Sequence, residues 1–500
     1  MVHRIFKATY FFASVTLLLF VGFGCASTQP AGWPSDIEQF RNFVLETHPK
    51  FSNEYFANIE RNVEMQAAFN ADIDALIANL HNLDDFEIML YMQHAAAILR
   101  DNHFCILSAQ LAQQNEIEIY PVGFRFLSDG FYLLTTTEPF AAALNHRLVA
   151  VGGRDIDDVF TYFTILWSVE NVYHAKSAFA RMINNPLLLD ALHLRDGEQV
   201  VFTLGDAEGE AIDIALNTTV LMDTLIAASF PTFPVDNREE GAPPRFMDIR
   251  GRAGSGHNWF EFIQGYDILY IRLELYLQNI DSETGIFAPF AQDVKLAFEE
   301  FAPRAVIVDA RYNPGGDNAY LTELFEFLAQ NTASGMLFHF VDEGSMSGSL
   351  LAAAHLKSLG AILVGQPLGQ NTSFYGFHTT TNLGELDFGD LSHLEEEDPD
   401  EIIRVGISIT EYPYHEVLEL TIREFLELAE GGSYVASPHL TLSHSGLHIS
   451  VPNVPVSTSD MFNIDLEFYA LRPHVLINYT IQDWINNRDP LLMYVLEQLE

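Results

Sequence analysis

The chain has 500 residues, of which 48% are hydrophobic and 12% aromatic, so it can bury at least one large core and is not a disordered protein. Its formal net charge is −43, with 68 acidic residues against 25 basic ones. Such a charge repels phosphate backbones and anionic lipid surfaces. Nucleic acid is therefore excluded as an expected partner, and so is membrane attachment through basic patches.

The first residues have the pattern of a secretory signal, because Arg4 and Lys7 precede an apolar run that ends shortly before Cys25. We expect a signal peptide over 1–24 and a polar tether over 25–35. The segment resembles a bacterial lipoprotein signal, which implies that Cys25 is acylated and anchors the protein to a membrane of the cell envelope. Plain secretion and an uncleaved anchor helix are the alternatives.

Composition shifts divide the rest of the chain. Apolar residues at helical spacing predict a helical cap over 36–110, and short alternating runs predict a β-rich module with a helical insertion over 111–224. Prolines and glycines mark a linker over 225–258. Residues 259–500 then form the expected core.

In that core, apolar strand candidates alternate with helix candidates, which predicts an α/β fold. The expected strands cover 268–273, 305–308, 336–341 and 361–364, and the expected helices 288–300, 320–329 and 349–359. The sequence has neither a phosphate-binding loop ending in Gly-Lys-Ser/Thr nor a His-Glu-x-x-His metalloprotease motif. We therefore expect no cofactor and no metal.

Three segments carry residues suited to catalysis. The first, over 99–104, contains His103, which by itself fits a buried core histidine as well as a base. The second, over 306–317, is a buried strand that runs into Gly315 and Gly316, a turn whose bare N–H groups suit an oxyanion hole.

The third segment, over 344–354, places Ser345, Ser347 and Ser349 at the start of a predicted helix. A serine at a helix N-terminus is most often a cap, so the residue type alone does not identify a nucleophile. Cys105 is a further candidate nucleophile near His103, although its Phe-Cys-Ile-Leu surroundings favour a buried apolar residue.

In this order, the three segments resemble the tail-specific (C-terminal processing) protease family, which includes the tricorn core and the retinoid-binding protein of photoreceptors. The resemblance implies a crotonase-like (ClpP-like) α/β core behind the helical cap. It also implies Ser347 as nucleophile, His103 as base, and an oxyanion hole from the N–H of Gly348 with that of Gly315 or Gly316. The β-rich run over 148–156 resembles half of a PDZ domain, with a plain hairpin as the alternative.

The base cannot be the lysine that some family members use. The corresponding position is Thr372, and no lysine follows Lys357, which lies about 15 Å along the helix axis from Ser347. A serine hydroxyl needs an activating base, so His103 is the candidate, as in the tricorn-like branch.

Near the C-terminus, Glu467 precedes Pro473 by six residues, as a glutamate precedes a Pro-Asp in tricorn-like enzymes. The resemblance implies that Glu467 orients His103, with Asn102 at the position of a relay serine. Two departures stand out, since His474 replaces the aspartate and Asn102 replaces the serine.

These observations predict an exported serine endopeptidase that acts on peptide or protein substrates. The rival prediction is a catalytically inactive protein of the same fold that binds a peptide or an apolar ligand. The segment over 374–440, longer than usual for the family, is either a lid or a solvated insertion.

Overall fold

The computed structural model describes residues 32–106, 118–195, 197–206, 209–220, 228–229, 258–274, 276, 290–316, 321–376, 380–382, 402–408, 415–421, 433–435, 439–467 and 469–500. The expected signal peptide, Cys25, almost all of the expected linker and much of the 374–440 segment lie outside these residues. The chain divides into two compact units, one of 1–99, 104–112 and 379–452, the other of 100–103, 113–378 and 453–500. The mixed α/β fold expected from the sequence is confirmed.

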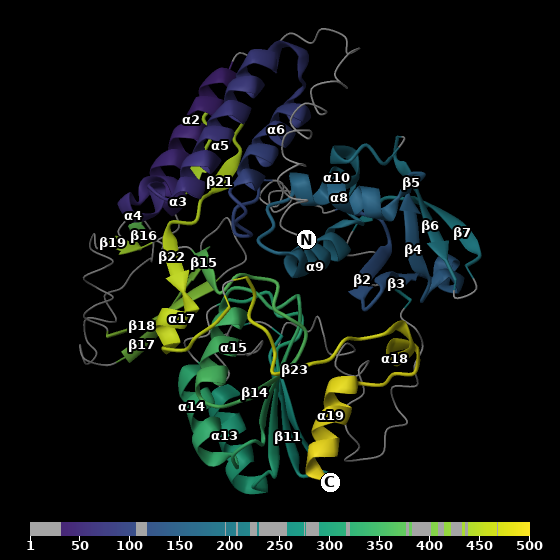
Figure 1. The fold of residues 1–500 in the computed structure, drawn as a ribbon, viewed down its shortest axis with the longest axis vertical. Coiled ribbons are helices and arrows are strands. Elements are labelled where there is room, and N and C mark those ends of the chain that lie inside the picture. The colour runs from purple at the N-terminus through teal and green to yellow at the C-terminus, as the bar shows by residue number, and fades with distance from the viewer. Residues whose placement is uncertain are drawn as a thin grey trace. The chain divides into compact units, whose positions relative to one another are not determined.

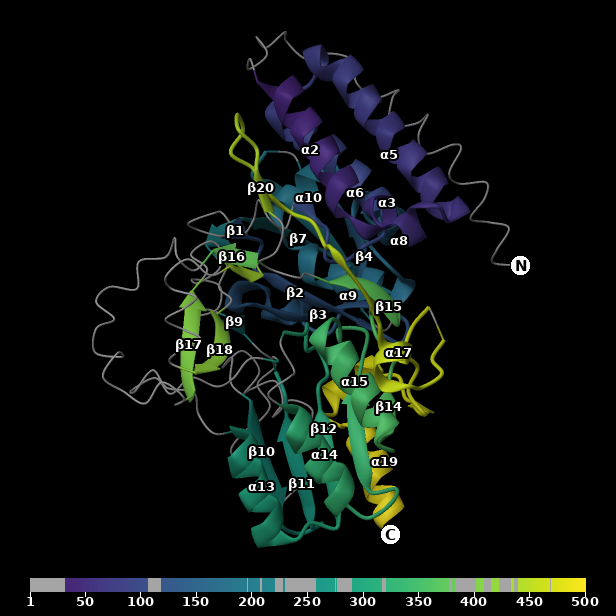
Figure 2. The ribbon, with the colours of Figure 1, turned by 90° about the vertical axis from the view of Figure 1, so that its left-hand side faces the viewer.

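Helices dominate the first unit. They are α2 (Trp33–Thr47), α3 (Pro49–Ser52), α4 (Glu54–Ala57), α5 (Glu60–Asn79) and α6 (Asp85–Ile98), with a 3-10 turn over Leu80–Asn82. Figure 2 shows α2 and α5 side by side, where the rings of Phe40 and Phe69 meet edge to face at 5.9 Å. A reciprocal capping box between Asp84 and Glu87 begins α6.

The described residues of the first unit also form three short antiparallel strand pairs. They are β16 (Thr380–Asn382) with β19 (Ser433–Val435), β17 (Ile402–Ser408) with β18 (His415–Thr421), and β20 (His439–Thr441) with β21 (His448–Ser450). The buried carboxylate of Asp36 on α2 accepts N–H bonds from His444 and Ser445, which ties the β20–β21 turn to the helices.

The second unit begins with a β-rich module, as the alternating runs predict. Its antiparallel sheet has the order β2 (Val122–Leu127), β3 (Gly130–Thr137), β4 (Arg147–Val151), β6 (Gln199–Gly205), β7 (Ala211–Asn217). In addition, β5 (Arg154–Asp155) pairs with β4, and β9 (Ala228–Ser229) pairs with β3. A separate pair joins β1 (Glu118–Ile119) to β8 (Thr219–Val220). The helices are η3 (Glu138–Ala143), α8 (Ile156–Leu166), α9 (Val172–Met182) and α10 (Pro186–Ala191), and rings of Phe131, Phe163 and Phe179 pack between sheet and helices.

A six-stranded sheet forms the core of the second unit. Its order is β10 (Trp259–Ile263), β11 (Ile268–Arg272), β12 (Ala305–Asp309), β13 (Leu337–Val341), β14 (Ile362–Gly365), β23 (Val475–Leu476), and all neighbours are parallel except β10 and β11. The central strands are buried on both faces, which explains their continuous apolar runs.

Helices cover both faces of this sheet, as Figure 1 shows. On one face lie α13 (Phe290–Phe301), α14 (Thr322–Asn331) and α15 (Gly348–Ser358), packed through Val294, Leu324 and Leu356. On the other lie α18 (Ile481–Ile485) and α19 (Pro490–Leu499), packed through Trp484 and Leu491. The strand pair β15 (Ser373–Gly376) with β22 (Val454–Ser457), followed by α17 (Thr458–Phe462), completes the unit.

A buried ionic network lies at the carboxyl end of β12. Arg311 is fully buried and donates to Asp309, to Tyr479 and to Asp489, whose carboxylate is 2.8 Å from the guanidinium. Arg272 is the second arginine at Asp309, with its Nη1 3.1 Å from the carboxylate. Burial alone would raise the pKa of Asp309, but the two arginines hold it well below its usual range.

Among the described residues, no helix is both long and apolar enough to cross a membrane.

Neutralising Asp489 should be strongly destabilising, because it leaves Arg311 with one buried counter-charge fewer. Asp489→Asn keeps a good N-cap for α19 but removes the charge, and we expect a loss of about 3–5 kcal/mol in the free energy of unfolding. Urea unfolding at pH 7 measures it. The control is Asp155→Asn, an exposed N-cap of α8 with no ion pair among the described residues, for which we expect a change of at most about 0.5 kcal/mol. Equal losses for the two variants would contradict the importance of the network.

Candidate active site

Ser347 lies in the turn between β13 and α15, immediately before the first residue of the helix. Its backbone has φ 51° and ψ −122°, a conformation that non-glycine residues rarely adopt. Asp342 stabilises the turn, because its Oδ1 accepts N–H bonds from Tyr312 at 2.8 Å and from Gly344 at 3.0 Å. Asp342 thus joins the loop after β12 to the turn that carries the serine.

The glycine turn after β12 packs directly against Ser347. Gly315 has φ 111°, and a Cβ atom there would lie 2.7 Å from the Cβ of Ser347. A Cβ atom on Gly348 would lie 2.1 Å from the carbonyl oxygen of Gly316. Only glycines permit this approach of the two backbones.

Two of the three amides expected in the oxyanion hole are free to donate. The N–H of Gly315 is used, because it donates to Asn313 Oδ1 at 2.8 Å. The N–H groups of Gly316 and Gly348 have no hydrogen-bond partner in the part of the chain that the structure describes. The backbone beside Ser347 therefore offers Gly316 and Gly348 as donors, whereas Gly315 shapes the turn.

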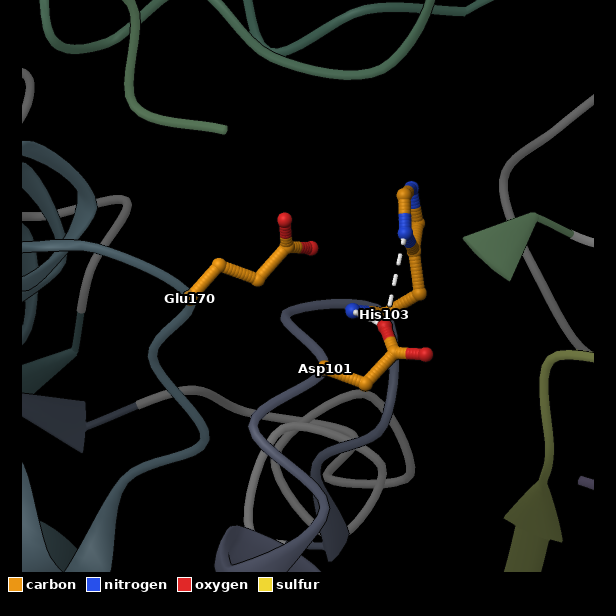
Figure 3. Close-up of side chains that lie close together, drawn as sticks. All are labelled: Asp101, His103 and Glu170. Atoms are coloured by element: carbon orange, nitrogen blue, oxygen red, sulfur yellow. Dashed lines mark hydrogen bonds and ion pairs between the residues drawn. The ribbon is translucent and has the colours of Figure 1, made fainter. Parts of the chain in front are cut away.

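His103 lies near the carboxylates of Asp101 and Glu170, as Figure 3 shows. Its Nδ1 is 3.8 Å from Asp101 Oδ1, and the same oxygen accepts the backbone N–H of His103 at 3.0 Å. Glu170 approaches from the loop between α8 and α9. On its other side the imidazole stacks on the ring of Phe374 in β15, with ring centres 5.7 Å apart. Only 14% of the His103 side chain is exposed.

Burial alone would lower the pKa of His103, because the charged imidazolium loses water. The side-chain hydrogen bond to Asp101, the charges of Asp101 and Glu170, and the backbone of Tyr375 outweigh that effect and raise the pKa above its ordinary value. The cluster therefore stabilises a protonated His103, which is what a general base needs once it has accepted a proton.

Glu170 was not expected from the sequence. Its carboxylate accepts N–H bonds from Asn371 at 3.0 Å and from Asn102 at 3.4 Å, and a side-chain bond from Gln370 at 3.2 Å. Burial and the neighbouring Asp101 raise the pKa of Glu170 to about 7. Its loop ends at the N-cap Asn171, but no local pattern distinguishes this glutamate from others in so acidic a chain.

Gln370, also unexpected, connects Ser347 to the histidine. Its Oε1 accepts the backbone N–H of Ser347 at 2.5 Å, and its Nε2 lies 3.5 Å from His103 Nδ1. The side chain is fully buried. In the sequence, the only indication of a role for Gln370 was that it is a polar residue in the segment that follows β14.

Glu467 stands apart from this cluster. Its side chain is 67% exposed, and its carboxylate lies 3.0 Å from Arg472 Nε. Asn102, by contrast, belongs to the site, since its Oδ1 accepts from Gln370 at 3.0 Å. The structure thus brings Glu170, rather than Glu467, to His103. The thiol of Cys105, the other candidate nucleophile, contacts Gln93 Oε1 at 3.4 Å.

Asp101, His103 and Glu170 also form the one group within the described residues whose ligand atoms, all within 4.8 Å of one another, suit a metal ion. Their carboxylates already accept N–H bonds from His103, Asn102 and Asn371. A cation would have to compete with these donors, so the contacts fit the orientation of an imidazole better.

The chain matches no protein-family model and no curated protein. Among solved structures, mature CPAF complexed with lactacystin is 12% identical, with a TM-score of 0.54 over 93% of this chain and 97% of that one. The CPAF s499a mutant is 11% identical, with a TM-score of 0.52 over 93% and 96%. The photosystem II D1 C-terminal processing protease is 11% identical, with a TM-score of 0.35 over 89% and 92%. The CPAF likeness shows that this chain shares the fold of that protein.

The close contact of Gly315 with Ser347 makes the site sensitive to one added methyl group. We expect Gly315→Ala to slow the reaction of Ser347 with a fluorophosphonate probe by about 100-fold, because the new Cβ displaces the serine. The matched control is Gly360→Ala, which has a similarly strained φ of 93° but meets no atom within 4 Å. If the two variants reacted equally fast, backbone strain alone would explain the effect.

Proposed function

We propose that this protein is a serine endopeptidase that hydrolyses peptide bonds through an acyl-enzyme. One observation carries the proposal: the buried Gln370 side chain holds both Ser347 and the His103–Glu170 pair, next to the two free glycine amides. Nucleophile, base, orienting carboxylate and oxyanion donors are the parts that acyl transfer requires.

In this mechanism the Oγ of Ser347 attacks the peptide carbonyl while His103 accepts the hydroxyl proton. The N–H groups of Gly316 and Gly348 donate to the developing oxyanion. His103 then gives its proton to the leaving amine, which departs as the C–N bond breaks and leaves an acyl-serine. Water, deprotonated by His103, hydrolyses that ester and restores the serine.

Asp101 and Glu170 act on His103 in each proton transfer. Their negative charge favours the imidazolium form, as the raised pKa of His103 indicates. Glu170 therefore takes the orienting role that the sequence resemblance gave to Glu467.

The shared fold supports the proposal but does not carry it, because one fold hosts many activities. Membership of the C-terminal processing proteases, in a branch that uses histidine rather than lysine, belongs to the proposal. So do export, a lipid anchor at Cys25, and peptide or protein substrates. No lysine beyond Lys357 exists to serve as an alternative base in the C-terminal part of the chain.

The direct test is covalent labelling of the purified protein with a fluorophosphonate, followed by peptide mapping. We expect one labelled serine, Ser347, and complete loss of labelling in Ser347→Ala. Ser349→Ala, two residues further on, should still be labelled. A wild-type protein that is not labelled would favour the inactive binding protein, and a labelled Ser347→Ala would place the nucleophile elsewhere.

The pH dependence tests the carboxylate. Because the pKa of His103 is raised, we expect kcat/KM to rise with pH through an acid limb above about 6.5. Glu170→Gln removes a charge that raises this pKa, so the limb should move down by about 0.5–1 pH unit and turnover should fall about 10–100-fold.

The control is Glu467→Gln, which changes an exposed glutamate paired with Arg472. We expect its activity to stay within about twofold of wild type, with an unchanged acid limb. The opposite pattern, with the limb shifted by Glu467→Gln and not by Glu170→Gln, would return the orienting role to Glu467.

A further inference from the structure

The Gln370 side chain contacts the Ser347 backbone, His103, Glu170 and Asn102. Besides the Ser347 N–H at 2.5 Å, its amide lies 3.0 Å from Asn102 Oδ1, 3.2 Å from Glu170 Oε1 and 3.5 Å from His103 Nδ1. It follows β14 in the chain and is fully buried. A buried amide with these contacts is placed by its hydrogen bonds.

The two ends of this amide are not interchangeable. Its oxygen faces an N–H donor, whereas its NH₂ group faces the oxygens of Asn102 and Glu170. A flipped amide would oppose NH₂ to the Ser347 N–H and oxygen to two oxygens. Only an uncharged group with an acceptor at one end and donors at the other satisfies all of these neighbours.

The serine needs such a support. With φ at 51°, Ser347 holds a backbone conformation that persists only when its surroundings fix it. Asp342 fixes the preceding Gly344, and helix α15 fixes the residues that follow. The carbonyl groups of Met346 and Ser347 accept helical N–H bonds from Ser349 and Leu351, and the Ser347 N–H donates to Gln370.

We infer that Gln370 is a positioning residue that clamps the Ser347 backbone to the His103–Glu170 pair through a single amide. The inference rests on the proposed peptidase function and adds to it a residue that sets both the direction of the nucleophile and the charge beside the base.

The clamp has an electrostatic consequence. Burial and the charge of Asp101 raise the pKa of Glu170. The hydrogen bond that Gln370 donates favours the ionised carboxylate and lowers this pKa. The charge of Glu170 in turn raises the pKa of His103. Within the described part of the chain, the other titratable groups facing His103 are Asp101 and His174. Burial lowers the pKa of His174 to about 3, so it stays neutral.

Two variants of similar size should therefore move the pKa of His103 in opposite directions. Gln370→Met removes the donor, so Glu170 is less ionised and the pKa of His103 falls by about 0.5 unit. Gln370→Glu adds a negative charge beside Glu170 and His103, so that pKa rises by about 0.5 unit. Both variants should slow fluorophosphonate labelling of Ser347 about 10–100-fold with folding intact.

The experiment is a titration of ¹³C-labelled histidines by NMR, with the His103 resonance assigned through His103→Gln, alongside probe labelling and thermal unfolding. Gln366→Met, a change of the same type at a buried glutamine four residues earlier, is the control and should alter neither quantity.

Opposite pKa shifts with slower labelling would support the clamp. Equal or absent shifts in both variants would overturn it, and faster labelling would show that Gln370 restrains the serine in an unreactive state instead. A wild type that is not labelled refutes the peptidase and not the clamp, because the His103 titration needs no activity. If Gln370→Met does not fold, Gln370→Glu decides alone, by whether the pKa of His103 rises.

Discussion

The position of the site depends on the buried charges around Arg311. Two arginines, 272 and 311, face two aspartates, 309 and 489, with the four side chains at most 4% exposed. Charges buried so deeply are tolerated only when each is paired and hydrogen-bonded, so their geometry has little freedom. Asp309 ends β12 and Asp489 is the N-cap residue of α19, so the network fixes one end of the sheet to the C-terminal helix. The loop that carries the glycine turn begins at Arg311, so the network also fixes the start of this loop.

From this anchor, hydrogen bonds lead to the nucleophile. The residue after Arg311, Tyr312, donates its N–H to Asp342, which also holds Gly344, and the glycine turn then packs on Ser347. Tyr312 and Ser347 both have positive φ, as does Arg100 next to the histidine loop. Non-glycine residues in that region raise the free energy of the fold by about 1–3 kcal/mol each, and such strain persists where the surrounding structure over-determines the backbone. Three such residues in the segments that form one site indicate that rigid neighbours impose its geometry.

The sequence predicts the parts of this site that depend on short-range patterns. Continuous apolar runs identify the parallel strands, and a strand that ends in Gly315 and Gly316 identifies the turn beside the serine. Glu170 and Gln370 could not be found in this way, because their roles arise from tertiary contacts between distant segments, 170 with 371 and 347 with 370. The spacing to Pro473 pointed to Glu467, but spacing says nothing about exposure, and this glutamate pairs with Arg472 at the surface. The sequence also does not show that the Gly315 N–H donates to Asn313, because this bond is known only from the structure.

The two carboxylates beside His103 differ in how they act on it. Asp101 uses one oxygen to accept the backbone N–H of His103, and that oxygen lies 3.8 Å from Nδ1. Its side-chain interaction with the ring and its charge both raise the pKa of His103, and it also stabilises the turn. Glu170 is held by three donors from two other segments, and only one of them, the Gln370 amide, comes from a side chain. Catalytic hydrogen bonds are often long before substrate binds and shorten in the complex. Asp101 is bonded to the backbone of the histidine loop itself, whereas Glu170 approaches the imidazole from a different segment.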